Sequence, residues 1–429
     1  MLGIRFRHTW RPTASSHLPK DGDGDFNPRV ESPSQPVEPG VDRNMLTTDS
    51  IEILSKLVGF KSLSGQSNHD IADYVETFAK SLGAAIQRFP SADGTRTSLL
   101  VTLGPMVPGG IVLSGHMDVV PAGNQSWTSD PFALREADGR LYGRGAVDMK
   151  GFLALALSLA ATIPIAELTK PLHLAFSYDE EISCEGVKPI VCHIEKSVPK
   201  PLAVIVGEPT ELQVVGAHKG ALDWTVEVLG KAAHSSLPHL GANAIHAAAR
   251  LVCEVEQIAR EFEKQPSPNT GLYDVPHPTV TVGVIEGGTA GNVIAARCSF
   301  QMEARTLEPG QATTIFERIS NLARDVVLPG LRATAPGSEI KITARFDIPP
   351  LVREASSAAE QLVSRFSSSS NVKAVSYATE AGFFQAAGLP TVVFGPGSIS
   401  QAHQVDEFID KTQFKEGGRV LAQIVQTLF

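Results

Sequence analysis

The chain has 429 residues, of which 42% are hydrophobic and 19% charged, and its formal net charge is −9. This length favours two domains over one, and the composition is that of a globular protein with a core of normal size. The acidic balance argues against a nucleic-acid partner, and no apolar run reaches the roughly 18 residues that span a membrane.

The first 44 residues differ in composition from the rest. Residues 1–20 contain Arg5, Arg7, Arg11 and Lys20 but no acidic side chain, and residues 21–42 are rich in Pro, Gly, Ser and Asp. We interpret 1–44 as a disordered or extra N-terminal tail. The four cysteines form no Cys-x-x-Cys pair, so we expect reduced thiols in a cytoplasmic protein. An alternative interpretation of the basic N-terminal segment is a transit peptide, which would direct the protein to an organelle matrix.

Regular periodicity begins after Met45. Apolar residues at helical spacing predict helices over 51–58 and 71–82, and the segment 152–163 is apolar all round, which is typical of a buried helix. Short apolar runs predict strands over 111–113, 172–176, 203–206 and 391–394. Strands that alternate with helices indicate an α/β domain with a mixed, mostly parallel sheet and helices on both faces.

The middle of the chain has a different pattern. Residues 222–228 and 298–304 alternate strictly between apolar and polar side chains, as in antiparallel strands with one solvated face, and 242–262 supplies a long helix. We therefore expect a smaller α+β domain over 217–345, inserted into a larger domain formed by 45–216 and 346–429.

Each predicted strand of the larger domain is followed by histidines or acids. Because ligand sites of open α/β sheets lie at the carboxyl ends of the strands, we expect these residues to converge. Histidines and carboxylates without cysteine suit a pair of hydrolytic divalent ions, with zinc as the first choice. The candidates are His116, Asp118, Asp148, Glu180, Glu181, Glu208 and His403.

Each of these signals is weak when taken alone. A single His-x-Asp is more often a capped turn than a metal site, and paired acids usually form a solvated face. Five signals at strand ends together favour a metal centre. A metal-free homologue that binds peptides or serves as a subunit is the alternative from another functional class.

Longer motifs surround these residues. They read S-G-H-M-D-V-V-P at 114–121, G-R-G-A-V-D-M-K-G at 143–151, D-E-E at 179–181, G-E-P-T at 207–210 and Q-A-H-Q at 401–404. With these motifs the chain resembles, from about residue 47 to its end, the zinc-dependent aminoacylase, carboxypeptidase and deacetylase family. The resemblance implies two Zn²⁺ ions, which Co²⁺ could replace.

The resemblance also assigns roles. One zinc would be held by His116 and Glu208, the other by Glu181 and His403, and Asp148 would bridge them, with a cis peptide bond after it. The carboxylate of Asp118 would accept the second ring N–H of His116 and orient the ring. Glu180 would be the general base that takes a proton from the attacking water and passes it to the leaving amine.

The inserted domain would act as a lid and a dimerisation domain. In the resembling family, the loop around His234 reaches the site of the partner subunit, so His234 would stabilise the oxyanion across a homodimer. Asn292 and Arg305 match lid segments that bind the substrate α-carboxylate, for which the Arg fork is suited. A lid salt bridge is the alternative for Arg305.

The run Y-A-T-E-A-G at 377–382 and the run G-P-G-S around Gly397 resemble members of the family that deacetylate N2-acetyl-L-ornithine. Glu380 would meet the δ-ammonium of that substrate or serve as a hydrogen-bond acceptor behind the site, and Gly397 would line the substrate site. The implied reaction releases L-ornithine and acetate from this small N-acyl amino acid, in arginine biosynthesis. The enzymatic alternatives are an aminoacylase, a carboxypeptidase or a succinyl-diaminopimelate desuccinylase.

Overall fold

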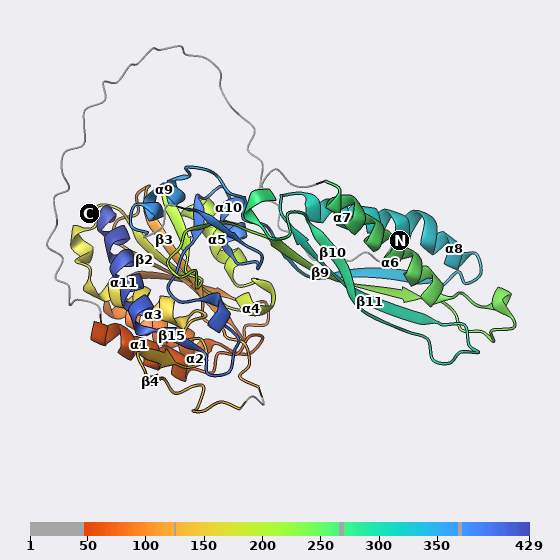
Figure 1. Cartoon of the computed structure of the whole chain (residues 1–429), viewed down its shortest axis with the longest axis horizontal. Helices are drawn as coiled ribbons and strands as arrows, with labels where there is room; N and C mark the ends of the chain where they lie inside the picture. Colours follow the sequence, from red (N-terminus) through yellow and green to blue (C-terminus); the bar gives the residue numbers. More distant parts are fainter. Residues whose placement is uncertain (1–46, 124–125, 266–269, 368–370) are drawn as a thin grey trace, which may run out of the picture.

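The computed structural model describes residues 47–123, 126–265, 270–367 and 371–429. Figure 1 shows two units: a broad larger domain that contains both α1 (Thr47–Gly59) and α11 (Lys411–Val425), and an elongated inserted domain formed by the middle of the chain. The predicted tail over 1–44 lies outside the described residues. Among the described residues, no helix combines the length and the apolar character that a membrane crossing requires.

An eight-stranded sheet forms the centre of the larger domain. Its central pairs, between β6, β3, β7 and β14, are parallel, while β1 and β2 form an antiparallel edge. The expectation of a mixed, mostly parallel sheet is thereby confirmed. In spatial order the strands are β1 (Ala85–Pro90), β2 (Thr97–Leu103), β6 (Leu172–Ser177), β3 (Ile111–His116), β7 (Ala203–Val206), β14 (Thr391–Val393), β8 (Val215–His218) and β13 (Lys373–Val375).

Helices cover both faces of this sheet. Leu113 and Leu174 point into the core beneath α1, α3 and α11, whereas their neighbours Val112 and Ala175 point into the core beneath α5 and α10. Because both faces are buried, the strands carry no polar face, which explains why they appear in the sequence as continuous apolar runs. Besides α1 and α11, the described helices of this domain are α2 (His69–Ser81), α3 (Lys150–Thr162), α4 (Glu180–Ser183), α5 (Val187–Ser197), α9 (Ala358–Ser364) and α10 (Ala381–Ala386).

Smaller elements complete this domain. A three-stranded sheet joins the C-terminal strand β15 to a hairpin from the first half of the chain. Its strands are β4 (Arg135–Ala137), β5 (Arg140–Tyr142) and β15 (Phe408–Asp410). Short 3₁₀ helices in the chain lie at Ile165–Glu167, Pro238–Leu240, Thr270–Leu272, Ile399–Gln401 and Gln426–Leu428.

The inserted domain is an antiparallel sheet covered on one face by helices. The strand order is β10 (Thr279–Gly287), β11 (Arg297–Thr306), β9 (Gly220–Leu229) and β12 (Glu339–Ile348). Trp224 of β9 packs against Phe316 with ring centroids 5.5 Å apart. As predicted, buried side chains alternate with more exposed ones along most of β9 and β11. The covering helices are α6 (Ala244–Glu263), α7 (Gln311–Leu322), a π-helical turn at Ala323–Val327 and α8 (Leu328–Arg332).

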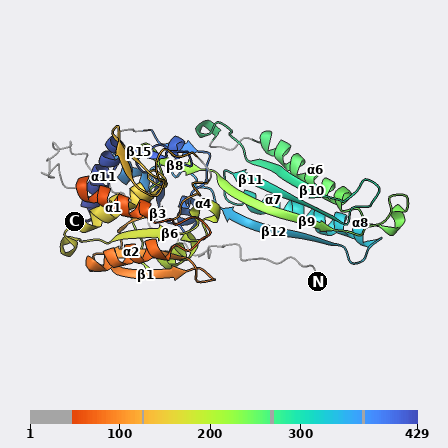
Figure 2. The same cartoon turned by 90° about the horizontal axis from the view of Figure 1, so that it is seen from below.

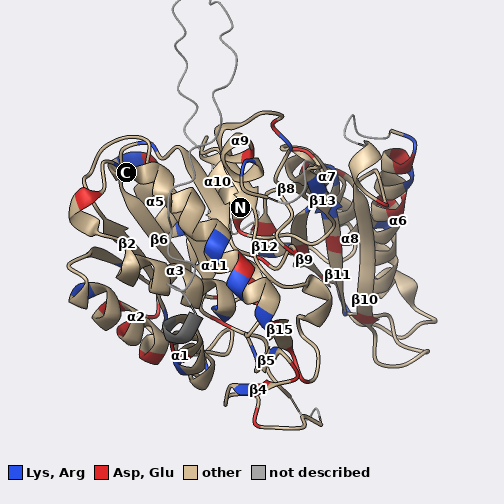
Figure 3. Ribbon diagram, turned by 60° about the vertical axis from the view of Figure 1, so that its left-hand side comes forward, with Lys and Arg blue, Asp and Glu red and all other residues tan. Residues whose placement is uncertain are grey.

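Two strands carry the chain between the domains. It leaves the larger sheet at the end of β8, continues directly into β9, and returns at the end of β12, as Figure 2 shows. The predicted limits at 217 and 345 therefore fall inside β8 and β12. Figure 3 shows mostly acidic residues on α2 and mostly basic residues on α11.

Candidate metal centre

The strand ends bring the predicted ligands to one edge of the larger sheet. His116 is the last residue of β3, Glu181 follows the end of β6, and Glu208 follows the end of β7. Asp148 precedes the buried helix α3, and the bond from Asp148 to Met149 is cis, as expected. His403 comes from the segment between β14 and β15.

Asp148 lies between two histidines. Its Oδ1 is 3.1 Å from Nε2 of His116, and its Oδ2 is 3.3 Å from Nε2 of His403. His403 Nε2 also lies 2.9 Å from Oε2 of Glu181. The two oxygens of one carboxylate thus face two separate sets of ligand atoms, which is the arrangement that a carboxylate bridging two ions needs.

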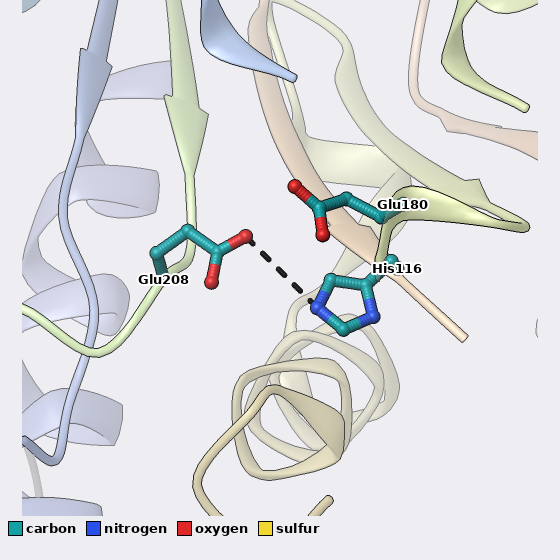
Figure 4. A group of neighbouring side chains, drawn as sticks. All are labelled: His116, Glu180 and Glu208. Carbon is teal, nitrogen blue, oxygen red and sulfur yellow. Dashed lines mark ion pairs between the residues drawn. The ribbon is translucent and has the colours of Figure 1, made fainter. Parts of the chain in front are cut away.

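The other set lies deeper in the domain. Glu208 Oε1 is 4.0 Å from Nε2 of His116, and Figure 4 shows the carboxylates of Glu208 and Glu180 both on the side of the imidazole that faces the centre. Ligand atoms of His116, Glu180 and Glu208 lie within 4.8 Å of one another, as do those of His116, Asp148 and Glu181. Oε1 of Glu208 is buried and has no hydrogen-bond partner within the part of the chain that the structure describes.

The electrostatics of this cluster favour bound cations. Burial raises the pKa of Glu180 and of Glu208 well above the ordinary value, and neighbouring carboxylates raise both further. Hydrogen bonds from the ring of His403 to the carboxylates of Asp148 and Glu181 raise the pKa of His403 to about 10. Several carboxylates that are buried together can all stay ionised only when positive charge lies among them. The residues present therefore fit a pair of divalent ions. Oε1 of Glu208, which accepts no hydrogen bond from the described residues, is available as a ligand atom.

One contact differs from the prediction. Nδ1 of His116 lies 2.8 Å from the main-chain carbonyl oxygen of Asp118, whereas the Asp118 carboxylate is 3.7 Å away. That carboxylate accepts hydrogen bonds from the N–H groups of Glu180 and Glu181, at 3.1 and 3.4 Å, and from the hydroxyl of Ser64 at 2.7 Å. Because these donors already occupy the carboxylate, the carbonyl orients the imidazole, and Nε2 faces the centre.

The turn that carries Glu180 is held by residues on both sides. Asp179 adopts a left-handed conformation (φ 55°), and its carboxylate accepts the N–H of Gly65 at 2.7 Å and pairs with Arg96. At the other end of α4, the thiol of Cys184 lies 3.5 Å from Oε1 of Glu180. Glu180 thus lies beside His116 on a turn fixed at both ends.

Two of the residues predicted to bind substrate, Glu380 and Gly397, pack against other parts of the larger domain. Glu380 is fully buried, and its two oxygens accept hydrogen bonds from the hydroxyls of Ser114 at 2.6 Å and Ser177 at 2.7 Å. The structure thus favours the second of the two alternatives, an acceptor behind the site. Gly397 has a φ of +86°, and a Cβ there would lie 2.4 Å from Val147, so close approach of the backbone requires glycine.

The residues of the inserted domain lie at its two ends. The loop of His234 follows the outer end of β9, and the N–H of Ser235 donates to the carbonyl of Asn292 at 2.9 Å, so these two segments adjoin. Arg305 lies at the opposite end of β11 and pairs with Glu303 at 2.5 Å. Since β9 has ten residues, and a strand rises about 3.3 Å per residue, His234 is remote from His116 of its own chain.

Two further residues belong to this region and had no predicted role. Ser64 comes from the loop before α2, where no motif pointed to it. Burial raises the pKa of Tyr377, and the negative charges of Glu208, Asp148 and Glu180 raise it further. Tyr377 stands at the start of the run Y-A-T-E-A-G, which was the available signal.

Comparisons with known proteins match most of the chain. The family model described as Peptidase family M20/M25/M40 matches residues 112–427. The chain is 34% identical over 395 residues to a protein named acetylornithine deacetylase from Photorhabdus laumondii, covering 87% of this chain and 96% of that protein. It is also 34% identical over 388 residues to the protein of the same name from Proteus mirabilis, covering 88% and 96%.

Solved structures share the fold at lower identity. An M20 family metallo-carboxypeptidase from Sulfolobus solfataricus matches with a TM-score of 0.67 and 18% identity, covering 89% of this chain and 99% of that one. A dinuclear metal-binding peptidase of the M20 family from Bacillus subtilis matches with a TM-score of 0.61 and 16% identity, covering 89% and 98%. Both alignments include the inserted domain along with the larger one, since they cover most of each chain.

Proposed function

The chain belongs to Peptidase family M20/M25/M40, and we propose that it hydrolyses N2-acetyl-L-ornithine to L-ornithine and acetate, a step of arginine biosynthesis. Its family and relatives make it a metal-dependent amidohydrolase. The observation that carries the proposal is the carboxylate of Asp148, whose two oxygens face His116 and His403 within 3.3 Å. The choice of substrate rests on the two relatives that are named for it.

We assign the ions to two ligand sets that share Asp148. His116 and Glu208 would hold one ion, and Glu181 and His403 the other, with Zn²⁺ as the proposed metal and Co²⁺ as a possible substitute. Bound there, the ions supply Lewis-acid polarisation of the scissile carbonyl and a lowered pKa of the attacking water. Histidine and carboxylate ligands without cysteine are consistent with either metal.

Glu180 is the proposed general base. It lies within reach of His116 and Glu208, yet it is not needed to complete either ligand set. Its carboxylate takes the proton of the attacking water and then donates that proton to the nitrogen of the leaving amine, so no net proton remains on the protein. The turn held by Asp179 and Cys184 keeps this carboxylate directed at the centre.

Substrate specificity depends on residues from both domains in this proposal. Arg305 would bind the α-carboxylate of the substrate, although it is paired with Glu303 in the structure. Glu380 is no longer proposed to contact the δ-ammonium, because both of its oxygens accept hydrogen bonds inside the core. In this proposal, Glu380 accepts hydrogen bonds from Ser114 of β3 and Ser177 of β6 and so keeps the ends of these two strands together.

A homodimer through the inserted domain completes the site in this proposal. β10 is an edge strand of its sheet, and its residues Val284 and Ile285 are 47% and 51% exposed. Leu237 and Leu240, in the loop after His234, are also exposed. An exposed apolar edge is suited to pairing with a second copy across a two-fold axis. His234 and Asn292 would then reach the centre of the partner subunit.

The test is a substrate panel on the purified, metal-loaded protein. Its members are N2-acetyl-L-ornithine, N-succinyl-LL-diaminopimelate, N-acetyl-L-methionine and a dipeptide. We expect the highest kcat/KM for acetyl-ornithine and loss of all activity on chelation. A higher kcat/KM for the succinyl compound, the methionine derivative or the dipeptide would replace the proposed function with a desuccinylase, an aminoacylase or a peptidase.

A further inference from the structure

A buried ion pair lies directly beneath the loop of Asp148. Arg144 Nη1 donates to Oε2 of Glu407 at 2.7 Å, and the side chains of both residues are 1% exposed. The other oxygen of Glu407 accepts the main-chain N–H groups of Val147 at 3.0 Å and of Asp148 at 3.2 Å. Glu407 is therefore bonded to the residue that faces both histidines and to the residue before it.

Glu407 also belongs to the segment that carries His403. The stretch from His403 to the end of β15 is fastened to the stretch from β5 to Asp148 at several points. The carbonyl of Glu407 accepts the N–H of Gly143 at 2.9 Å, and β15 pairs with β5. Two parts of the chain that are more than 250 residues apart are thus joined as one unit, with Glu407 at the junction.

We infer that Glu407 is a positioning residue that holds the carboxylate of Asp148 at a set spacing from His403, and so sets the distance between the two halves of the centre. The inference rests on the proposed function, in which Asp148 bridges two ions. A carboxylate suits this position because both of its oxygens accept hydrogen bonds, one from Arg144 and one from the backbone. An amide has a single acceptor oxygen, so glutamine would leave one side facing its NH₂ group.

A buried ion pair that only stabilises the fold is the competing interpretation. Removing one member of such a pair leaves an uncompensated buried charge and destabilises a protein whether or not a metal site is near. The two interpretations differ in the affinity of the folded protein for metal. Loss of an outer partner of metal ligands typically lowers metal affinity or activity by about 10–100-fold.

The experiment compares Glu407→Gln with a matched control, Glu360→Gln. Glu360 also accepts on both oxygens, from Nε and Nη2 of Arg353 at 3.2 Å each, and it lies in the larger domain on α9, outside both ligand segments. Metal-free protein of each variant is titrated with Co²⁺ below its melting temperature. The readouts are the number of ions bound, their affinity, and the visible absorption of bound Co²⁺, which depends on its ligand arrangement.

We expect Glu407→Gln to bind at least one Co²⁺ ion about tenfold or more weakly, with an altered absorption spectrum. Glu360→Gln should match the wild type in both, even where its melting temperature falls. Two ions bound to Glu407→Gln with wild-type affinity and spectrum would overturn the inference. If instead the wild type binds fewer than two ions, the proposed function fails and Glu407 is not the cause.

A second variant covers the case in which Glu407→Gln does not fold. Replacing both members, Arg144→Met with Glu407→Leu, leaves no unpaired buried charge and so avoids the main cause of instability. It still deprives Val147 and Asp148 of their acceptor. We expect the same weakening of Co²⁺ binding in this double variant, and wild-type binding there would equally overturn the inference.

Discussion

The main-chain carbonyl of Asp118 lies 2.8 Å from Nδ1 of His116, while the carboxylate of the same residue holds the turn of Glu180. One residue thus orients a metal ligand and positions the proposed base through different atoms. A substitution that changes the side chain alone separates these two roles. This relationship leads to the first prediction.

Asp118→Asn should keep both metal ions and lose activity. The carbonyl that orients His116 is unchanged, but a neutral amide accepts weaker hydrogen bonds from the N–H groups of Glu180 and Glu181 than a carboxylate does. We expect kcat to fall about tenfold or more, with metal content by elemental analysis equal to that of the wild type. Loss of metal in this variant would show that the carboxylate, and not the carbonyl, governs His116.

Glu180→Gln and Glu181→Gln should differ in metal content. Glutamine at 180 cannot accept the proton, so kcat should fall by about 10²–10⁴-fold while KM and metal content stay near the wild-type values. Glutamine at 181 weakens a ligand of the ion near His403, so metal content should drop and added zinc should restore part of the rate. The reverse pattern would mean that the two adjacent acids are assigned in the wrong order.

His234 should act in the partner subunit. A subunit with Glu180→Ala and a subunit with His234→Ala are each inactive as homodimers in the proposed arrangement. The mixed dimer has one site in which both residues are intact, so mixing should restore part of the activity. The measurement is activity after subunit exchange, with exchange confirmed by differently tagged chains. Absence of complementation despite confirmed exchange would assign His234 to its own subunit or to no site.

Glu380→Gln should affect stability more than substrate binding. The carboxylate accepts hydrogen bonds from Ser114 and Ser177 inside the core, and glutamine can accept at only one of its two terminal atoms. We expect the free energy of unfolding to fall by about 1–3 kcal/mol, as for a buried hydrogen-bonding group left unpaired. KM for acetyl-ornithine should change less than twofold. A large rise in KM with unchanged stability would show that Glu380 contacts the substrate.

His173 should make the fold less stable in acid. Burial lowers the pKa of His173 to about 4, whereas the unfolded chain has an ordinary value of about 6.5. Between these values the unfolded state binds a proton that the native state does not. Its contribution to stability is therefore complete above pH 6.5 and is lost as the pH falls towards 4, by about 3 kcal/mol.

Urea unfolding of metal-free protein at several pH values measures this loss. In His173→Gln the free energy of unfolding should depend less steeply on pH between 6.5 and 4. His69→Gln, at the partly exposed start of α2, serves as the control and should keep the wild-type slope. An unchanged slope in His173→Gln would show that the native state tolerates a charged imidazole there.

Three of the proposed metal ligands, His116, Glu181 and Glu208, could be located from the sequence because each stands at or just after the end of an apolar run that forms a strand. Strands of a parallel sheet end at a common edge, so residues such as His116 and Glu208 converge once the sheet forms. The buried helix α3 and the alternating strand β9 were predictable for a similar reason. The spacing of apolar residues within each of these segments indicates which of its faces is buried, so no contact with a distant segment has to be known.

Contacts between distant segments were decided only by the tertiary structure. The sequence does not indicate that Asp118 uses its carbonyl for His116, because that choice depends on donors from Ser64 and from α4. Nor does it indicate that Glu380 is covered, since Ser114 and Ser177 come from two other strands. Glu407 likewise meets Asp148 across more than 250 residues. The sequence determines the residue types and the local periodicity of apolar side chains. Which polar atoms pair with one another depends on how distant segments pack together.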